Sequence, residues 1–165
     1  MAERTRPVST IARVGAAENK ALVVRFYEEV WNRGNVSFAH EVFADEYVRH
    51  DLRPPDPPPG PDGQAMIAEQ FRLAFPDLEW NVDLVLGEGD LVAARWTAAG
   101  TQSGAWGDVE ATGKRVRFSG VNIFRFGGGG KVIEIWNHRD DLGLMEQLGA
   151  SVFAGATPSG ASANT

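Results

Sequence analysis

The end of the last predicted strand carries the residues best suited to proton transfer. Trp136, His138 and Asp140 alternate along this strand and are therefore expected on one of its faces. If that face lines an apolar pocket, burial raises the pKa of the Asp140 carboxyl toward neutrality, so that it can take a proton next to a carbonyl. His138 would then orient Asp140 or act as a second acid or base. The alternative is that Asp140 caps the strand in a salt bridge with Arg139 or Arg95.

Other polar side chains lie where substrate contacts are expected. Asn122 interrupts an apolar strand face, where an amide either donates to a ligand or ties two strands together. Arg95 could bind a substrate carbonyl, although an outward-facing arginine is the common case. His50 ends a short strand beside a proline-rich loop and could hold a substrate oxygen or bond the loop. Five large aromatic residues are expected mainly in the core or at subunit contacts, and some of them should line the cavity. They are Tyr27, Trp80, Trp96, Trp106 and Trp136.

The composition excludes several classes of site and partner. The 165 residues contain no cysteine, which removes thiolate nucleophiles, thiolate zinc sites and iron–sulfur clusters. A net charge of -6 offers no surface for a phosphate backbone or an anionic membrane. The histidines His40, His50 and His138 are too widely spaced in sequence to indicate a metal site. No apolar run suits a signal peptide or a membrane span, so we expect a cytoplasmic protein without nucleic-acid or membrane partners.

Helices are predicted in the first half of the chain. Apolar residues recur at helical spacing from Glu18 to Trp31, and Gly34 ends that helix. A short helix over Ser37–Phe43 and an extended stretch over Glu46–His50 follow. These elements precede any long segment of alternating apolar residues, which indicates that helices and strands are segregated along the chain.

The proline-rich segment and the two ends differ from the rest of the chain. Six of the nine prolines lie in Pro54–Pro61, a loop that could form a rim or lid, and Asp62 is predicted to cap a third helix that runs to Phe75. Residues 1–16 and 151–165 are predicted to be flexible segments. We therefore expect one folded domain over residues 17–150.

The second half of the chain alternates with the period of strands. The predicted strands are Leu78–Leu86, Leu91–Ala99, Arg115–Phe126 and Lys131–Asp140. Gly127–Gly130 forms a turn, and a last short helix over Leu142–Leu148 is expected to be capped by Asp141 and stopped by Gly149. Helices followed by strands predict an α+β fold, with helices over one face of a curved antiparallel sheet. Such a sheet encloses an apolar cavity that suits a flat hydrophobic ligand.

Five longer stretches of the sequence carry a family resemblance. They read RFYEEVWNRGN, FADEYVRHD, AFPDLEWNVDLVLGEGDLVAARWTAAGTQSG, TGKRVRFSGVNIFRF and KVIEIWNHRDDLGLMEQLGA. Together they resemble the SnoaL-like polyketide cyclase (ester cyclase) family of the NTF2-like superfamily, over about Glu18 to Ala150. The resemblance implies a cone-shaped barrel with three to four helices over the concave face of the sheet. It also implies a deep apolar pocket, no metal or organic cofactor, and oligomers formed through the outer face of the sheet.

The resemblance also assigns roles to single residues. The family pattern WxxxD followed by LGLxxQLG makes Asp140 the general acid/base, with His138 or His50 assisting. The position directly after the strand tryptophan, frequently an acid in the cyclases, is Asn137 here. Where the family commonly reads GTHxG this chain reads GTQSG, so Gln102 keeps hydrogen bonding but loses proton transfer. The expected substrate-binding residues are Tyr27, Arg95, Gln102, Trp106, Asn122 and Trp136.

Three functions remain open from the sequence. The first is a cofactor-independent cyclase that closes a ring in an aromatic or polyketide-derived small molecule by an aldol reaction. The second is a related hydroxylase, which the NHRDD motif favours, or an epoxide-opening enzyme, whose Arg-x-Asp pattern is incomplete because Thr97 stands in place of the acid. The third is a binding module without turnover, because fold alone does not decide function. Apolar residues on both faces of the strands also predict a homodimer or a higher even oligomer.

Overall fold

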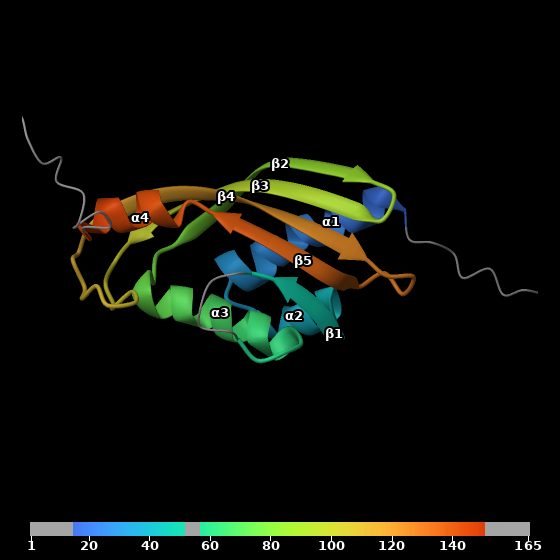
Figure 1. Ribbon diagram of the computed structural model, residues 1–165, viewed down its shortest axis with the longest axis horizontal. Coiled ribbons are helices and arrows are strands. Elements are labelled where there is room, and N and C mark those ends of the chain that lie inside the picture. The colour runs from blue at the N-terminus through green and yellow to red at the C-terminus, as the bar shows by residue number, and fades with distance from the viewer. Residues whose placement is uncertain (1–14, 52–56, 151–165) are drawn as a thin grey trace, which may run out of the picture.

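The computed structural model of the chain describes residues 15–51 and 57–150. These residues form a sheet with α1, α2 and α3 packed over one of its faces and α4 at one end (Figure 1). The elements in chain order are α1 (Ala16–Phe26), η1 (Tyr27–Asn32), η2 (Val36–Phe38), α2 (Ala39–Val42), β1 (Phe43–His50), α3 (Pro61–Ala74), β2 (Glu79–Glu88), β3 (Leu91–Thr101), β4 (Arg115–Phe126), β5 (Val132–Arg139) and α4 (Asp141–Leu148). The predicted α+β fold with a curved sheet beneath helices is confirmed.

The sheet contains five strands in the order β1-β5-β4-β3-β2. Strands β2 to β5 pair antiparallel, as predicted, and short turns join β2 to β3 and β4 to β5, whereas the longer loop 102–114 joins β3 to β4. The first strand differs, since β1 pairs parallel with β5 at one edge of the sheet. The chain then passes through α3 to reach β2 at the opposite edge. The connection from β1 to β5 thus contains α3 and strands β2 to β4, and a parallel pair requires a long connection of this kind.

The first predicted helix continues past α1 as a π-helical turn, η1. Tyr27 and Trp31 are buried on this turn. Asn32 fixes it to the sheet, because its Nδ2 donates to the Trp80 carbonyl oxygen at 3.0 Å and its Oδ1 accepts from the Trp80 amide at 2.8 Å. Arg72 of α3 donates to the Trp31 carbonyl oxygen at 3.1 Å. The turn, the sheet and α3 are therefore held together around the rings of Trp31 and Trp80, whose centroids are 4.4 Å apart.

Two predicted helix caps are wrong. Helix α3 begins at Pro61 after Gly60, because a proline suits the first helical position and Gly60 adopts a φ of 79°. Asp62 lies within the first turn instead and contacts His40, with 2.9 Å between Oδ1 and Nε2. Helix α4 is capped by Asp140 and not by Asp141, since Asp140 Oδ1 accepts from the Gly143 amide at 2.8 Å. Gly149 ends α4 in a left-handed conformation, as predicted.

Most of the predicted end segments lie outside the described residues, as do Pro54 and Pro55 of the predicted rim or lid. Ala16, assigned from sequence to the N-terminal segment, begins α1. In residues 15–51 and 57–150, no helix is both long enough and apolar enough to cross a membrane.

Candidate functional site

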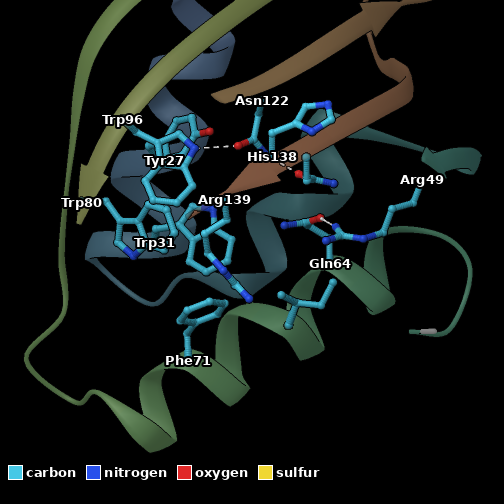
Figure 2. Close-up of a pocket in the computed structure, with 12 residues that line it drawn as sticks. Tyr27, Trp31, Arg49, Gln64, Phe71, Trp80, Trp96, Asn122, His138 and Arg139 are labelled. Carbon is cyan, nitrogen blue, oxygen red and sulfur yellow. Dashed lines mark hydrogen bonds between the residues drawn. The ribbon is translucent and has the colours of Figure 1, made fainter. Parts of the chain in front are cut away.

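A small cavity of about 30 Å³ lies between the helices and the sheet (Figure 2). It is lined by Tyr27, Trp31, Arg49, Gln64, Ile67, Phe71, Trp80, Trp96, Asn122, Asn137, His138 and Arg139. This volume accommodates about one water molecule or one ligand oxygen. We call it the deep cavity. The predicted substrate contacts Tyr27 and Asn122 are among its walls, whereas no carboxylate is.

A chain of side-chain hydrogen bonds crosses the sheet at the wall of the deep cavity. Trp96 Nε1 donates to Asn122 Oδ1 at 2.6 Å, and Asn122 Nδ2 donates to Asn137 Oδ1 (Figure 2). The strand register explains the contact, because Asn122 of β4 lies directly opposite Asn137 of β5. Both amide oxygens are therefore already used as acceptors. The prediction that the Asn122 amide links two strands is confirmed. Contact between Asn122 and a ligand stays a prediction.

Several buried polar atoms around the deep cavity have no hydrogen-bond partner. Among the described residues, six buried side-chain nitrogen or oxygen atoms are unpartnered, and five of them belong to residues that line this cavity. The five are Tyr27 Oη, Trp31 Nε1, Arg49 Nε, Trp80 Nε1 and Asn137 Nδ2. Burial raises the pKa of Tyr27 well above its usual value, so its hydroxyl keeps its proton at neutral pH.

A larger groove of about 720 Å³ adjoins the deep cavity and shares Arg49, Ile67, Phe71 and Arg139 with it. We call it the outer groove. Its other lining residues are Asp51, Pro57, Met66, Gln70, Leu73, Ala105, Trp106, Gly107, Asp141 and Met145. This volume is in the range of small-molecule sites, and apolar and aromatic walls with a few polar groups are typical of them. Trp106, predicted to contact substrate, lies in this groove.

Two arginine–aspartate pairs stand where the deep cavity and the outer groove meet. Arg49 contacts Asp51, with 2.7 Å between Nη2 and Oδ2, and its Nη1 donates to Gln64 at 3.2 Å. Arg139 Nε donates to Asp141 Oδ1 at 2.5 Å. The Arg139 guanidinium also lies 4.8 Å from the Phe71 ring centroid (Figure 2). Asp51 and Asp141 are thus carboxylates held in a largely apolar wall.

A third groove, of about 610 Å³, lies beside β1 and β5 and contains the predicted residues His50, Trp136 and His138. The His50 ring stacks on Trp136 at 4.7 Å, and its Nε2 is 2.9 Å from Glu134 Oε2. This groove shares Arg49, Asp51, Arg139 and Asp141 with the outer groove. His138 thus borders both the deep cavity and this third groove, whereas His50 lines the third groove and neither of the other two.

The structure does not bring Asp140 into any of these cavities. Asp140 is exposed, and one of its oxygens accepts from Gly143. From β5, Asn137, His138 and Arg139 border the deep cavity, and Asp141 lies beyond them in the outer groove. A catalytic role for Asp140 stays a prediction, and its neighbour Asp141 lines the outer groove.

Arg95, Trp136 and His138 lie on the outer face of the sheet. Register pairs Leu84 with Arg95, Arg95 with Val121, and Val121 with His138, which forms one row across four strands. Trp136 and His50 belong to the neighbouring row. Arg95 contacts Asp83 on this face. His138 borders the deep cavity but is itself exposed, so contacts of these residues with a substrate stay predictions that the geometry does not favour.

Gln102 is fully buried but lines none of the cavities described above. Its Nε2 donates to the carbonyl oxygens of Val109 and Glu110, each at 3.2 Å, and its Oε1 accepts from Thr112. Gln102 therefore braces the loop 103–113, which carries Trp106. Its predicted contact with substrate remains without geometric support.

Sequence reasoning missed Arg49, Asp51, Arg139 and Asp141 as site residues. The signal was available for β5, because the strand alternation that places Trp136 and His138 on one face must place Asn137 and Arg139 on the other. Which face is internal could not be read from the strand alone, since both carry polar and apolar residues. Among the described residues, no group of three or more potential metal ligands occurs.

Comparisons with known proteins identify similar chains. A family model described as SnoaL-like polyketide cyclase matches residues 21–148. The structure of TsrD from Streptomyces laurentii is similar with a TM-score of 0.76 and 27% identity, covering 84% of this chain and 99% of that one.

Two further solved structures carry names that suggest activities. AclR from Streptomyces galilaeus, a candidate hydroxylase, has a TM-score of 0.72 and 30% identity, covering 82% of this chain and 98% of that one. IdmH from Streptomyces antibioticus, a candidate polyketide cyclase, has a TM-score of 0.67 and 27% identity, covering 80% of this chain and 99% of that one. The comparison with curated proteins found no match.

Proposed function

Because the chain belongs to the SnoaL-like polyketide cyclase family, we propose that it is an acid/base enzyme acting on an aromatic or polyketide-derived small molecule. The reaction best supported is ring closure by an intramolecular aldol addition, without an organic cofactor or metal. The observation that carries this proposal is a carboxylate, Asp141, in the wall of an apolar groove that opens beside a donor-lined cavity.

The proposed reaction needs one base, one site for negative charge and a fixed substrate conformation. The Asp141 carboxylate removes a proton from the carbon between two carbonyl groups, and the resulting enolate is delocalised over the substrate. The enolate carbon attacks a second carbonyl of the same molecule, forming a carbon–carbon bond and an alkoxide. Asp141 then returns its proton to the alkoxide, so the product has the mass of the substrate. Orientation in the groove and this proton relay each lower the barrier by several kcal/mol.

Arg139 has a positioning role in this proposal. Its guanidinium is hydrogen-bonded to Asp141 and stacked on Phe71, which fixes the carboxylate relative to the apolar wall. The Arg49–Asp51 pair holds the opposite side of the same junction. Asp51 is the second carboxylate of the groove, and it is the alternative base if Asp141 proves dispensable.

The test uses paired variants at neighbouring aspartates. Asp141→Asn removes the proposed base, and Asp140→Asn is its matched control, because asparagine caps a helix as well as aspartate does. Each protein is incubated with methyl esters of aromatic polyketides, and product mass and retention are followed. We expect a product of unchanged mass from the wild type and from Asp140→Asn. Asp141→Asn should lower turnover by about 10²-fold or more.

The opposite result is equally informative. Loss of turnover in Asp140→Asn with full turnover in Asp141→Asn would assign the base to Asp140, as the family pattern predicts. Ligand binding by the wild type with no product from any ester would instead favour a binding module. Melting temperatures of both variants check that neither change acts through the stability of α4.

A related hydroxylase is the second candidate, and Asn137 is the observation that favours it. An amide stands at the innermost position of β5, so the deep cavity has no carboxylate among its lining residues. AclR, the candidate hydroxylase, is also 30% identical to this chain. In the same assay a product heavier by one oxygen atom would identify this reaction.

A further inference from the structure

The wall of the outer groove contains a strongly exposed apolar side chain. Leu73 of α3 is 76% exposed, more than any other large apolar side chain of the described residues. Met66, Trp106 and Met145 line the same groove and are half-buried. A leucine left in water forgoes the free energy that its burial would supply. Exposed apolar surface that continues into a groove is typical of a surface that another segment of chain covers.

The end of α4 lies at this groove. Met145 of α4 is one of its lining residues. Lys114 Nζ donates to the Leu148 carbonyl oxygen at 3.4 Å, which joins the end of α4 to the loop between β3 and β4. The same loop contacts the end of α3, because the Ser103 amide donates to the Ala74 carbonyl oxygen at 2.9 Å. The ends of α3 and α4 therefore lie on either side of one loop (Figure 1).

The backbone at Gly149 sets where the chain leaves α4. Gly149 has a φ of 90°, and its amide donates to the Glu146 carbonyl oxygen at 3.0 Å. The Ala150 amide donates to the Met145 carbonyl oxygen, also at 3.0 Å. These two bonds form a Schellman motif, which turns the chain back at the end of a helix. The chain thus leaves α4 beside a residue that lines the outer groove.

The residues that follow suit an apolar wall. Segment 151–165 contains no charged residue, and its only large apolar side chains are Val152 and Phe153. Burying these residues therefore desolvates no charged side chain. Phe153 comes three residues after Ala150, which allows it to lie anywhere within about 10 Å of that residue. Both large side chains are thus placed where the chain passes the groove, and the rest of the segment is small or polar.

We propose that residues 151–154 form a strap across the outer groove, with Val152 and Phe153 docked on the apolar wall that contains Leu73 and Met145. The short connection to α4 gives the strap a high effective concentration at the groove of its own chain, which favours this groove over that of a second copy. The docked strap restricts the access of solvent to the groove and has to move before a ligand can enter. This inference does not depend on the reaction proposed above.

Disulfide trapping tests the strap on the full chain. The natural sequence contains no cysteine, so an introduced pair has no competing thiol. Gln70→Cys and Ala154→Cys place one thiol on α3, one turn before Leu73, and one directly after Phe153. Gln70 is exposed and lines the outer groove. The rate of intramolecular disulfide formation in a glutathione buffer is followed by mass spectrometry, without any substrate.

Matched variants separate docking from simple proximity. Adding Phe153→Ser to the cysteine pair keeps the length of the connection but removes the ring, and should slow disulfide formation at least about tenfold. Adding Leu73→Ser instead should slow it at least about threefold, because the wall loses its exposed leucine. Adding Val24→Ser is the control, since Val24 is an exposed apolar residue on α1, and should leave the rate unchanged. Leu73 and Val24 are exposed, so neither change disturbs the core.

Equal rates with and without Phe153 would overturn the strap. A disulfide that joins two copies in dilute solution, in place of one within the chain, would assign the segment to the groove of a partner and reject the proposal. The result is independent of turnover. Failure of ring closure would leave anchor-dependent trapping in place, and equal trapping rates would leave the proposed cyclase untouched.

Discussion

The position of each residue along β5 decides which face of the sheet its side chain lies on, and therefore whether that side chain can reach a substrate. A shift of one residue along a strand moves a side chain to the other face of the sheet. His138 is therefore exposed while Arg139 packs on Phe71, and Asp141 rather than Asp140 reaches the groove. Asn137 occupies the inner position directly after Trp136, so the chemistry of the deep cavity is that of amides and donors.

The buried tyrosine Tyr27 should make the free energy of unfolding decrease at alkaline pH. Burial raises the pKa of Tyr27, so the unfolded chain loses this proton at a lower pH than the folded chain does. The resulting stability is complete well below the unfolded-state pKa of 10.0 and is lost as the pH rises through it toward the folded-state pKa. We expect the free energy of unfolding of the wild type to fall between pH 9.5 and 11 by up to about 1.4 kcal/mol per pH unit more than that of Tyr27→Phe. Urea denaturation at each pH measures this difference, and parallel curves for the two proteins would contradict it.

At the scale of elements, the site depends on segments that fix one another. The π-helical turn η1 presents Tyr27 and Trp31, and Asn32 bonds this turn to the backbone of Trp80. Across the groove, Gln102 braces the loop that carries Trp106. In both places a side-chain amide forms hydrogen bonds with backbone groups that have no partner in a helix or strand. These bonds fix the position of an irregular segment that forms part of the cavity or groove wall.

Replacing Gln102 should therefore destabilise the loop 103–113, with a smaller effect on the rate of the reaction. Gln102→Ala removes four hydrogen bonds, to Val109, Glu110 and Thr112, and should lower the free energy of unfolding by about 2 to 4 kcal/mol. Glu69→Ala, on the exposed side of α3 and outside the grooves described, is the control and should change it by less than about 0.5 kcal/mol. Hydrogen exchange should accelerate in residues 103–113 of the Gln102 variant. Unchanged exchange with a raised KM would instead support the substrate contact predicted from sequence.

The whole molecule presents an outer sheet face that is apolar as well as charged. Leu84 is 50% exposed and Leu86 is 59% exposed, and register places Val121 in the same row as Leu84. Exposed apolar side chains on one sheet face are typical of a subunit interface. The predicted oligomer would cover this face and leave the outer groove, on the other side of the sheet, open to substrate.

Light scattering of the purified chain measures the assembly directly. We expect a mass of at least twice 17.9 kDa for the wild type, in an even multiple. Val121→Lys places a charge at the centre of the face and should shift the mass toward the monomer. Val24→Lys, on the exposed side of α1, is the control and should not shift it. A wild-type monomer would refute the prediction.

The sequence by itself determined the fold class, the strands β2 to β5 and the family. These follow from local periodicity, turn residues and long matching stretches, and each is a property of neighbours in the chain. Asn122 and Tyr27 could also be named, because an amide or a hydroxyl within an apolar pattern is visible without coordinates.

Only the tertiary structure decided which face of β5 is internal and which aspartate reaches the groove. The two faces of β5 carry similar mixtures of polar and apolar side chains, with Asn137 on one face and Trp136 and His138 on the other. The sequence of β5 therefore does not indicate which face is buried. The choice is made by the helices that cover one face of the sheet, and Arg139 packs there on Phe71 of α3, which is far away in the chain (Figure 1). For the same reason the Arg49–Asp51 and Arg139–Asp141 pairs could not be combined into one site from sequence. They meet there because β1 and β5 lie side by side, so that both pairs line the same groove.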